Sequence, residues 1–150
     1  MSEPTCLVAD TICRTVELGV TITGAAIAEE LTWIDCRPVE HDPICPKCGT
    51  SGRLRDHVER ILTDLPVVGH PTRLRLRVPR FICGDESCPV TIFRQGIERV
   101  AAPKASTTRR CARWILQRLA IDKMSVSAVA KSLGLGWNTV NAVAAELTRE

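Results

Sequence analysis

The 150-residue sequence predicts an α+β fold, in which a small β domain at residues 41–102 precedes an all-α domain at residues 103–150. Two pairs of cysteines, Cys45 with Cys48 and Cys83 with Cys88, enclose most of the β segment and predict that its two ends meet. Within that segment, the stretch HPTRLRLRVPR alternates between apolar and basic residues, as a half-buried strand does. Beyond Pro103 the pattern changes, and apolar residues recur at helical spacing.

The composition is that of a folded protein with few aromatic residues. Hydrophobic residues make up 45% and charged residues 25%, whereas aromatic residues make up only 3%. The beginning of the sequence lacks the basic and apolar regions of a signal peptide, and no apolar run reaches about 18 residues, so we expect neither a signal peptide nor a membrane span. We therefore expect a cytoplasmic, nucleoid-associated bacterial protein in a reducing compartment, where cysteines bind metal more often than they form disulfides.

The charge is unevenly distributed along the chain. Residues 1–40 carry a net charge of −5, residues 41–100 carry +3, and residues 101–150 carry +5. An acidic beginning followed by a basic end is typical of proteins that bind nucleic acid. We expect double-stranded DNA as the partner, and neither a membrane nor a small-molecule substrate.

The acidic N-terminal segment, residues 1–40, is interpreted as structural. Val8, Ile12 and Val16 lie at intervals of four and predict a short helix that ends at Gly19. The segment VTITGAAIAEELTWIDCRPV that follows predicts two short strands leading toward the first cysteine pair. No residue here suggests chemistry, although the segment could contact another protein.

The four paired cysteines have the pattern of a structural zinc site. Two residues separate Cys45 from Cys48, and four separate Cys83 from Cys88. Four thiolates complete the tetrahedral coordination of one Zn²⁺ and leave no open position for catalysis. Zinc binding contributes roughly 10–16 kcal/mol in small zinc modules, which would compensate for a core poor in aromatic residues. The alternative is four thiols without a metal.

The interval between the two pairs predicts a hairpin. Leu74, Leu76 and Val78 lie on one face of a strand and alternate with three arginines. A second strand within VERILTDLPVVGH precedes it, with the turn expected at Gly69, His70 and Pro71. A hairpin that carries a ligand pair near each end is a zinc ribbon.

Other cysteine and histidine chemistry fits the sequence poorly. A zinc deaminase needs a His-x-Glu motif before its Cys-x-x-Cys, whereas His57-Val58-Glu59 follows Cys48. No His-Glu-x-x-His motif occurs. The three histidines are interpreted as surface or turn residues, and the remaining cysteines have no paired spacing. Of these, Cys6, Cys13 and Cys111 are predicted to be core thiols, and Cys36 is the fourth.

The basic C-terminal third predicts a helix-turn-helix. Ser106 or Thr107 caps a first helix that runs to about Ile121, and Ser125 caps the second. In VSAVAKSLGLGWNTVNAVAAEL, a small Ala130 lies where two helices cross. Gly134 lies where the turn requires a positive φ. The helix that begins near Trp137 would then be the recognition helix.

The residues expected to contact DNA fall into two groups. Side chains at the beginning of the recognition helix reach base edges, and basic side chains nearby bind phosphate. Two plainer interpretations remain open: the arginine-rich helix face is only solvated, and Trp137 is packed in the core. The predicted base contacts are Trp137, Asn138, Thr139 and Asn141, and the predicted phosphate contacts are Arg109, Arg110, Arg113 and Lys131.

Taken together, these segments resemble the N-terminal region of insertion-sequence transposases of the ISL-three family. The family pattern has a Cys-Pro-x-Cys-Gly knuckle, then Asp-Leu-Pro before a glycine, an arginine-rich strand that ends at an aromatic-x-Cys, and Cys-Pro before Thr-x-Phe. The matching positions are Cys45–Gly49, Asp64–Pro66 with Gly69, Arg73–Arg80, Phe81–Cys83 and Cys88–Phe93.

The resemblance implies a protein that binds the inverted repeats at the ends of an insertion sequence. Family members cut DNA with three acidic residues of a ribonuclease-H-like domain that follows the helix-turn-helix. After Pro103 this chain has only Asp122, Glu146 and Glu150, so we expect DNA binding without catalytic residues. A homodimer would suit paired element ends. The alternatives are a stand-alone regulator or truncated-transposase inhibitor, and a protein-interaction module.

Overall fold

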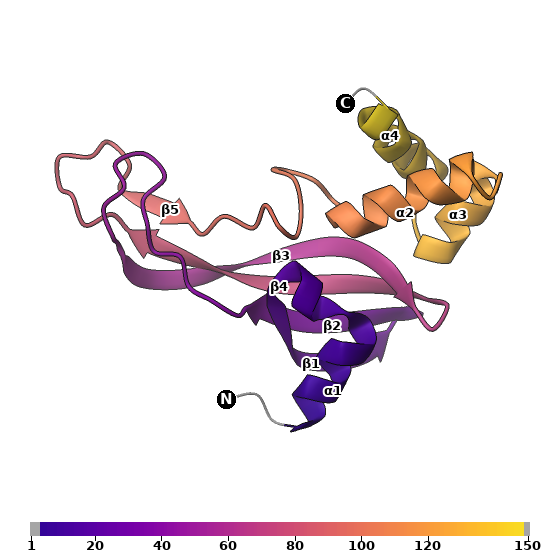
Figure 1. Ribbon diagram of the computed structural model, residues 1–150, viewed down its shortest axis with the longest axis horizontal. Helices are drawn as coiled ribbons and strands as arrows, with labels where there is room; N and C mark the ends of the chain where they lie inside the picture. The colour runs from indigo at the N-terminus through magenta and orange to yellow at the C-terminus, as the bar shows by residue number, and fades with distance from the viewer. Residues whose placement is uncertain (1–3, 149–150) are drawn as a thin grey trace.

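A mixed sheet forms the centre of the molecule, and three C-terminal helices lie at one end of it (Figure 1). The computed structural model describes residues 4–148, with side chains from Val8 onward. This architecture confirms the α+β class. In chain order the elements are α1 (Pro4–Cys13), the 3₁₀ helix η1 (Thr15–Leu18), β1 (Val20–Ala28), β2 (Leu31–Pro38), β3 (Arg53–Val67), β4 (His70–Ile82), β5 (Ile92–Arg94), α2 (Arg109–Ala120), α3 (Val126–Leu133) and α4 (Trp137–Thr148).

The predicted hairpin between the cysteine pairs is confirmed as β3 and β4. The two strands pair antiparallel from Arg53 opposite Ile82 to Val67 opposite His70. Leu74, Leu76 and Val78 are buried, as their alternation predicts. The turn lies one residue earlier than expected: Val68 and Gly69 are its central residues, with φ of 50° and 79°. Two successive positive φ values suit the twist of a two-residue hairpin turn.

The N-terminal segment contributes two strands to the same sheet, whose order is β1-β2-β4-β3, with β5 on the end of β4. β1 and β2 form the predicted strand pair and run antiparallel. β2 then pairs with β4 in parallel, from Thr32 opposite Thr72 to Cys36 opposite Leu76. The main core covers one face of this sheet. Its buried members are Leu18, Val20, Ile22, Ile34, Cys36, Leu62, Leu74, Leu76, Val78, Val100 and Ala101.

Helix α1 is attached by a carboxylate rather than by the apolar residues that predicted it. Val8, Ile12 and Val16 are all more than half exposed. Instead, the buried Asp10 accepts hydrogen bonds from Thr15 Oγ1 at 2.7 Å, from Thr21 Oγ1 at 2.7 Å and from the Ile22 amide at 2.8 Å. Burial raises the pKa of this carboxyl, but the three hydrogen bonds together lower it more, so the pKa lies below its ordinary value.

The C-terminal helices form the predicted helix-turn-helix with its own core. Thr108, rather than Ser106 or Thr107, caps α2, because its side chain accepts from the Cys111 amide. Ser125 caps α3 as predicted, and Gly134 ends α3 with φ of 65°. The buried side chains of this second core are Cys111, Ile115, Val129, Ala130, Leu133 and Val140.

The buried carboxylate of Asp64 fixes α2 to the sheet. Asp64 lies near the end of β3 and is 2% exposed. It accepts from Thr108 Oγ1 at 2.7 Å and from Arg110 Nε and Nη2 at 2.9 and 2.6 Å. The same guanidinium donates to the carbonyls of Cys13 and Arg14. Asp64 and Arg110 therefore join β3, the first turn of α2 and the end of α1.

Arg73 on β4 makes a second connection to the helices. Its Nη1 donates to Leu133 O and its Nη2 to Gly134 O, each at 2.8 Å. These carbonyls end α3, where the helix dipole favours a cation. A Cβ on Gly134 would lie 3.3 Å from Pro71 Cβ, so the turn between α3 and α4 packs closely against β4.

Replacing Arg110 with Ala should lower the free energy of unfolding by roughly 3–5 kcal/mol, because Asp64 would keep a buried charge without its partner. Arg113→Ala is the matched control on the same helix, where the side chain is exposed and the expected change is within about 0.5 kcal/mol. Urea unfolding of the zinc-loaded proteins measures both. Equal stabilities of the two variants would contradict the role given to Asp64.

Candidate metal centre and nucleic-acid interface

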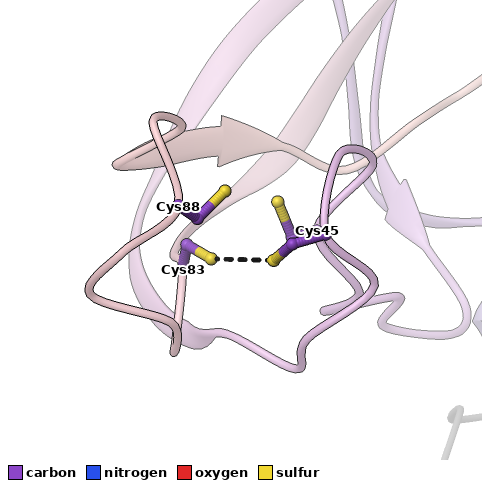
Figure 2. Close-up of side chains that lie close together, drawn as sticks. Cys45, Cys83 and Cys88 are labelled. Atoms are coloured by element: carbon purple, nitrogen blue, oxygen red, sulfur yellow. Dashed lines mark hydrogen bonds between the residues drawn. The ribbon is translucent and has the colours of Figure 1, made fainter.

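The four predicted zinc ligands meet at the end of the sheet remote from the helices (Figure 1). Cys45 and Cys48 lie in the loop before β3, and Cys83 and Cys88 follow β4. Because β3 and β4 are antiparallel, the start of one strand lies beside the end of the other. In Figure 2, Cys83 and Cys88 point toward the loop that carries Cys45.

The sulfur atoms are placed as a tetrahedral metal site requires. All four Sγ atoms lie within 4.8 Å of one another, and those of Cys48 and Cys83 are 3.5 Å apart. A tetrahedral Zn²⁺ with Zn–S bonds of about 2.3 Å needs sulfur atoms about 3.8 Å apart. The cluster fits one Zn²⁺ with four thiolate ligands.

Local hydrogen bonds and a small apolar cluster shape the two loops. The Gly49 amide donates to Cys45 O at 3.0 Å, and Gly49 has φ of 75°. In the second loop the Cys88 amide donates to Asp85 O at 3.1 Å. The cluster beneath the sulfurs has Cys45, Phe81 and Phe93 as its buried members. So small a cluster buries little apolar surface, and we infer that the metal supplies much of the stability at this end.

The pKa shifts of the Cys48 and Cys83 thiols also favour a bound cation. Hydrogen bonds from Thr50 lower the pKa of the exposed Cys48 thiol to about 6. At Cys83 the Asp85 amide lowers the pKa, but desolvation and the neighbouring sulfurs raise it more, to about 12. The Cys48 thiolate therefore forms readily, and its negative charge opposes ionisation of the Cys83 thiol. A divalent cation removes this opposition because it stabilises all four thiolates together.

The other described cysteines lie apart from this cluster. Cys36 and Cys111 are buried in the two cores, and burial raises the pKa of each thiol to about 12. Cys13 is half-buried, and desolvation raises its pKa too. Such thiols are unreactive, as expected of core residues. The side chain of Cys6 lies outside the described residues.

The beginning of α4 presents most of the predicted base contacts to solvent. Trp137 is 52% exposed, which excludes its alternative placement in the core. Asn138 and Asn141 are exposed, while Thr139 is half-buried. Val140, in the same first turns of α4, is fully buried and packs in the core that α4 shares with the other two helices.

The predicted phosphate contacts differ in their freedom to bind DNA. Arg113 and Lys131 are exposed, and no partner within the described chain holds either side chain. Arg109 is exposed and donates one hydrogen bond from Nε to Glu98 O. Arg110 corrects the prediction: its guanidinium is bound to Asp64 and to two backbone carbonyls. The sequence showed the charge of Arg110 but not this distant partner.

Among the described residues, the four cysteines are the only group of at least three side chains placed to bind one metal ion. Asp122 pairs with Arg118 at 2.9 Å, and Glu146 is exposed on α4. Glu150 lies outside the described residues. No helix within residues 4–148 is long and apolar enough to cross a membrane.

Comparison with known families finds a match for two segments of the chain. Residues 41–88 match the zinc-finger of transposase IS204/IS1001/IS1096/IS1165. Residues 99–147 match the helix-turn-helix domain of transposase family ISL3. Residues 41–147 carry two domains of the ISL3 transposase family. The matched regions are the zinc finger and the DNA-binding helix-turn-helix of an ISL3 transposase, as the sequence motifs predicted. No curated protein and no solved structure matches the chain.

The reduced protein should contain one Zn²⁺ per chain, and Cys88→Ser should remove most of it because it deletes one of four ligands. Cys13→Ser is the matched control, since Cys13 lies outside the cluster. Plasma mass spectrometry after dialysis measures the zinc content. Lowering the pH should release the metal from the unaltered protein, because protons compete for the thiolates. Full zinc retention by Cys88→Ser would contradict the assignment.

Proposed function

We propose that this chain binds the terminal inverted repeats of an insertion sequence in a sequence-specific manner, as the non-catalytic, DNA-binding part of a transposase acting in the bacterial cytoplasm. The observation that carries the proposal is the exposed beginning of α4 in an ISL3 helix-turn-helix. There Trp137, Asn138 and Asn141 lie outside the core. In a helix-turn-helix these positions enter the major groove.

The chemistry of these side chains suits base recognition. An asparagine amide can bond to N6 and N7 of adenine at once, and Asn138 and Asn141 each offer such a group. Trp137 offers apolar surface to a thymine methyl group. Thr139 is half-buried and fits a contact with the nearby phosphate better than a contact with a base.

Charges around α4 support a duplex rather than a protein as the partner. Residues 101–150 carry a net charge of +5. Arg113 on α2 and Lys131 on α3 are both exposed. The first helix of a helix-turn-helix, here α3, crosses the DNA backbone, which suits phosphate binding by Lys131. Helix α2 packs beside α3 and α4 in the same core, which suits the same role for Arg113. We assign Arg109, Arg113 and Lys131 to phosphate binding and leave Arg110 out.

The sheet serves in this proposal as a platform for the reading helices. Asp64 and Arg73 attach α2 and α3 to the same end of β3 and β4. The zinc site closes the opposite end of the hairpin. Loss of zinc would therefore weaken DNA binding through the platform and leave the contacts of α4 themselves unchanged. A second copy bound to the other repeat would bring the two element ends together.

A titration with two duplexes tests the proposal directly. One duplex carries the inverted repeat that flanks the encoding element, and the other is an unrelated sequence of equal length. We expect tighter binding to the repeat and a steep loss of affinity with salt, because each neutralised phosphate releases counterions. Equal affinity for the two duplexes would exclude recognition of the ends, and salt-insensitive binding would favour a protein-interaction module.

Asn138→Ala or Asn141→Ala should cost about 1–3 kcal/mol against the repeat and little against the unrelated duplex. Arg113→Ala should weaken binding to both duplexes alike and reduce the salt slope by about one. Fluorescence anisotropy over a salt series separates these outcomes. If the asparagine variants bound both duplexes as the unaltered protein does, α4 would not be the reading helix.

A further inference from the structure

The tip of the β3–β4 hairpin has a strained backbone. Val68 has φ of 50° and Gly69 φ of 79°. A two-residue turn of this kind favours Asn or Asp at the first position and Gly at the second. A β-branched residue with positive φ is an outlier, and such strain gathers at functional sites. Val68 is also 85% exposed, so burial within the described chain does not explain why an apolar residue stands there.

The strained turn is held rigidly. Thr72 is fully buried, and its hydroxyl donates to His70 O at 2.9 Å. The same oxygen accepts from the Val67 amide at 3.2 Å. These bonds connect both sides of the turn and fix the direction in which the side chains of Val68 and His70 project.

The tip lies directly beside the turn of the helix-turn-helix. Figure 1 shows the β3–β4 turn and α3 at the same end of the sheet. Arg73 binds the carbonyls of Leu133 and Gly134, and Pro71 packs against Gly134. Helix α4 begins at Trp137, shortly after Gly134. A cavity of about 360 Å³ behind the tip is lined by Leu65, Pro66, Gly69, Trp114 and Ser132, and so by both the hairpin and the helices.

We propose that Val68, Gly69 and His70 form a wing: a second DNA-contacting element that enters the minor groove next to the major groove read by α4. This inference rests on the proposed function, because the wing can contact DNA only if the chain binds a duplex through α4. A duplex that receives the beginning of α4 passes close to the tip. Proteins that bind the minor groove frequently insert apolar side chains there, between base steps.

The charges at this end of the molecule favour the β3–β4 tip over its neighbour. The β1–β2 turn also approaches the helix-turn-helix, since Leu31 Cδ2 lies 3.2 Å from the position of a Cβ on Gly134. That turn carries Glu29 and Glu30, both exposed, and two carboxylates repel phosphate. The β3–β4 tip, Val68–His70, carries no acidic residue. A bound duplex should therefore lie nearer to the β3–β4 tip than to the β1–β2 turn.

Val68→Asn tests the wing because it separates stability from binding. Asparagine tolerates a positive φ, so this variant should be at least as stable as the unaltered protein. Its affinity for the inverted-repeat duplex should nevertheless fall about tenfold, because the apolar contact is lost. The salt slope should not change, since no charge is removed. Val39→Asn is the matched control: Val39 is 58% exposed and follows the end of β2 that lies away from α2, α3 and α4.

The two proposals fail in distinguishable ways. If the unaltered protein showed no salt-dependent binding to duplex DNA, the proposed function would fail and the wing with it. If it bound the repeat and Val68→Asn bound equally well, only the wing would be excluded. Hydroxyl-radical footprinting provides a second readout: a protected minor-groove patch beside the α4 site should disappear in Val68→Asn and persist in Val39→Asn. Val68→Gly should repeat the result if the asparagine variant folds poorly.

Discussion

The placement of the helix-turn-helix depends on one buried carboxylate, Asp64. It lies on β3, accepts the hydroxyl that caps α2, and pairs with Arg110. Because the same guanidinium binds carbonyls at the end of α1, three segments distant in sequence meet at one charge. A buried ion pair contributes little net stability but is very costly to break. Its effect here is to specify one orientation of α2, and through α2 that of α4.

Zinc acts at the other end of the same strands. The antiparallel pairing of β3 with β4 brings the loops before and after the hairpin together, and four sulfurs close them. The apolar cluster beneath, built on Phe81 and Phe93, is too small to hold two irregular loops alone. Polar interactions therefore fix each end of the hairpin. At one end four thiolates bind a metal, and at the other Asp64 and Arg73 bind the C-terminal helices. The sheet between these two ends holds the helices in place and contributes no ligand or base contact of its own.

How much of this the sequence predicted depended on the range of each interaction. The zinc ligands, the alternation of β4 and Gly134 of the turn were all predicted, because each depends on spacing within a short stretch of chain. The parallel pairing of β2 with β4 was not, since a periodic pattern records which side chains are buried and not which strands meet. Arg110 failed for the same reason: its charge was visible, but its partner lies 46 residues away. The spacing of Val8, Ile12 and Val16 predicted one helix ending at Gly19, but α1 ends at Cys13, Arg14 has φ of 56°, and Val16 lies in η1. The polar contacts of Asp10 decided which face of α1 was buried.

Every function proposed for this chain requires that α4, held on the end of the sheet, reads DNA. The most direct test is an amide nuclear magnetic resonance titration of the zinc-loaded protein with the inverted-repeat duplex, because it reports every segment at once. We expect large shifts at Trp137–Asn141 and at Val68–His70, and small shifts around Cys45 and Cys88. Shifts concentrated in the zinc loops, with α4 unaffected, would contradict this role of the helix.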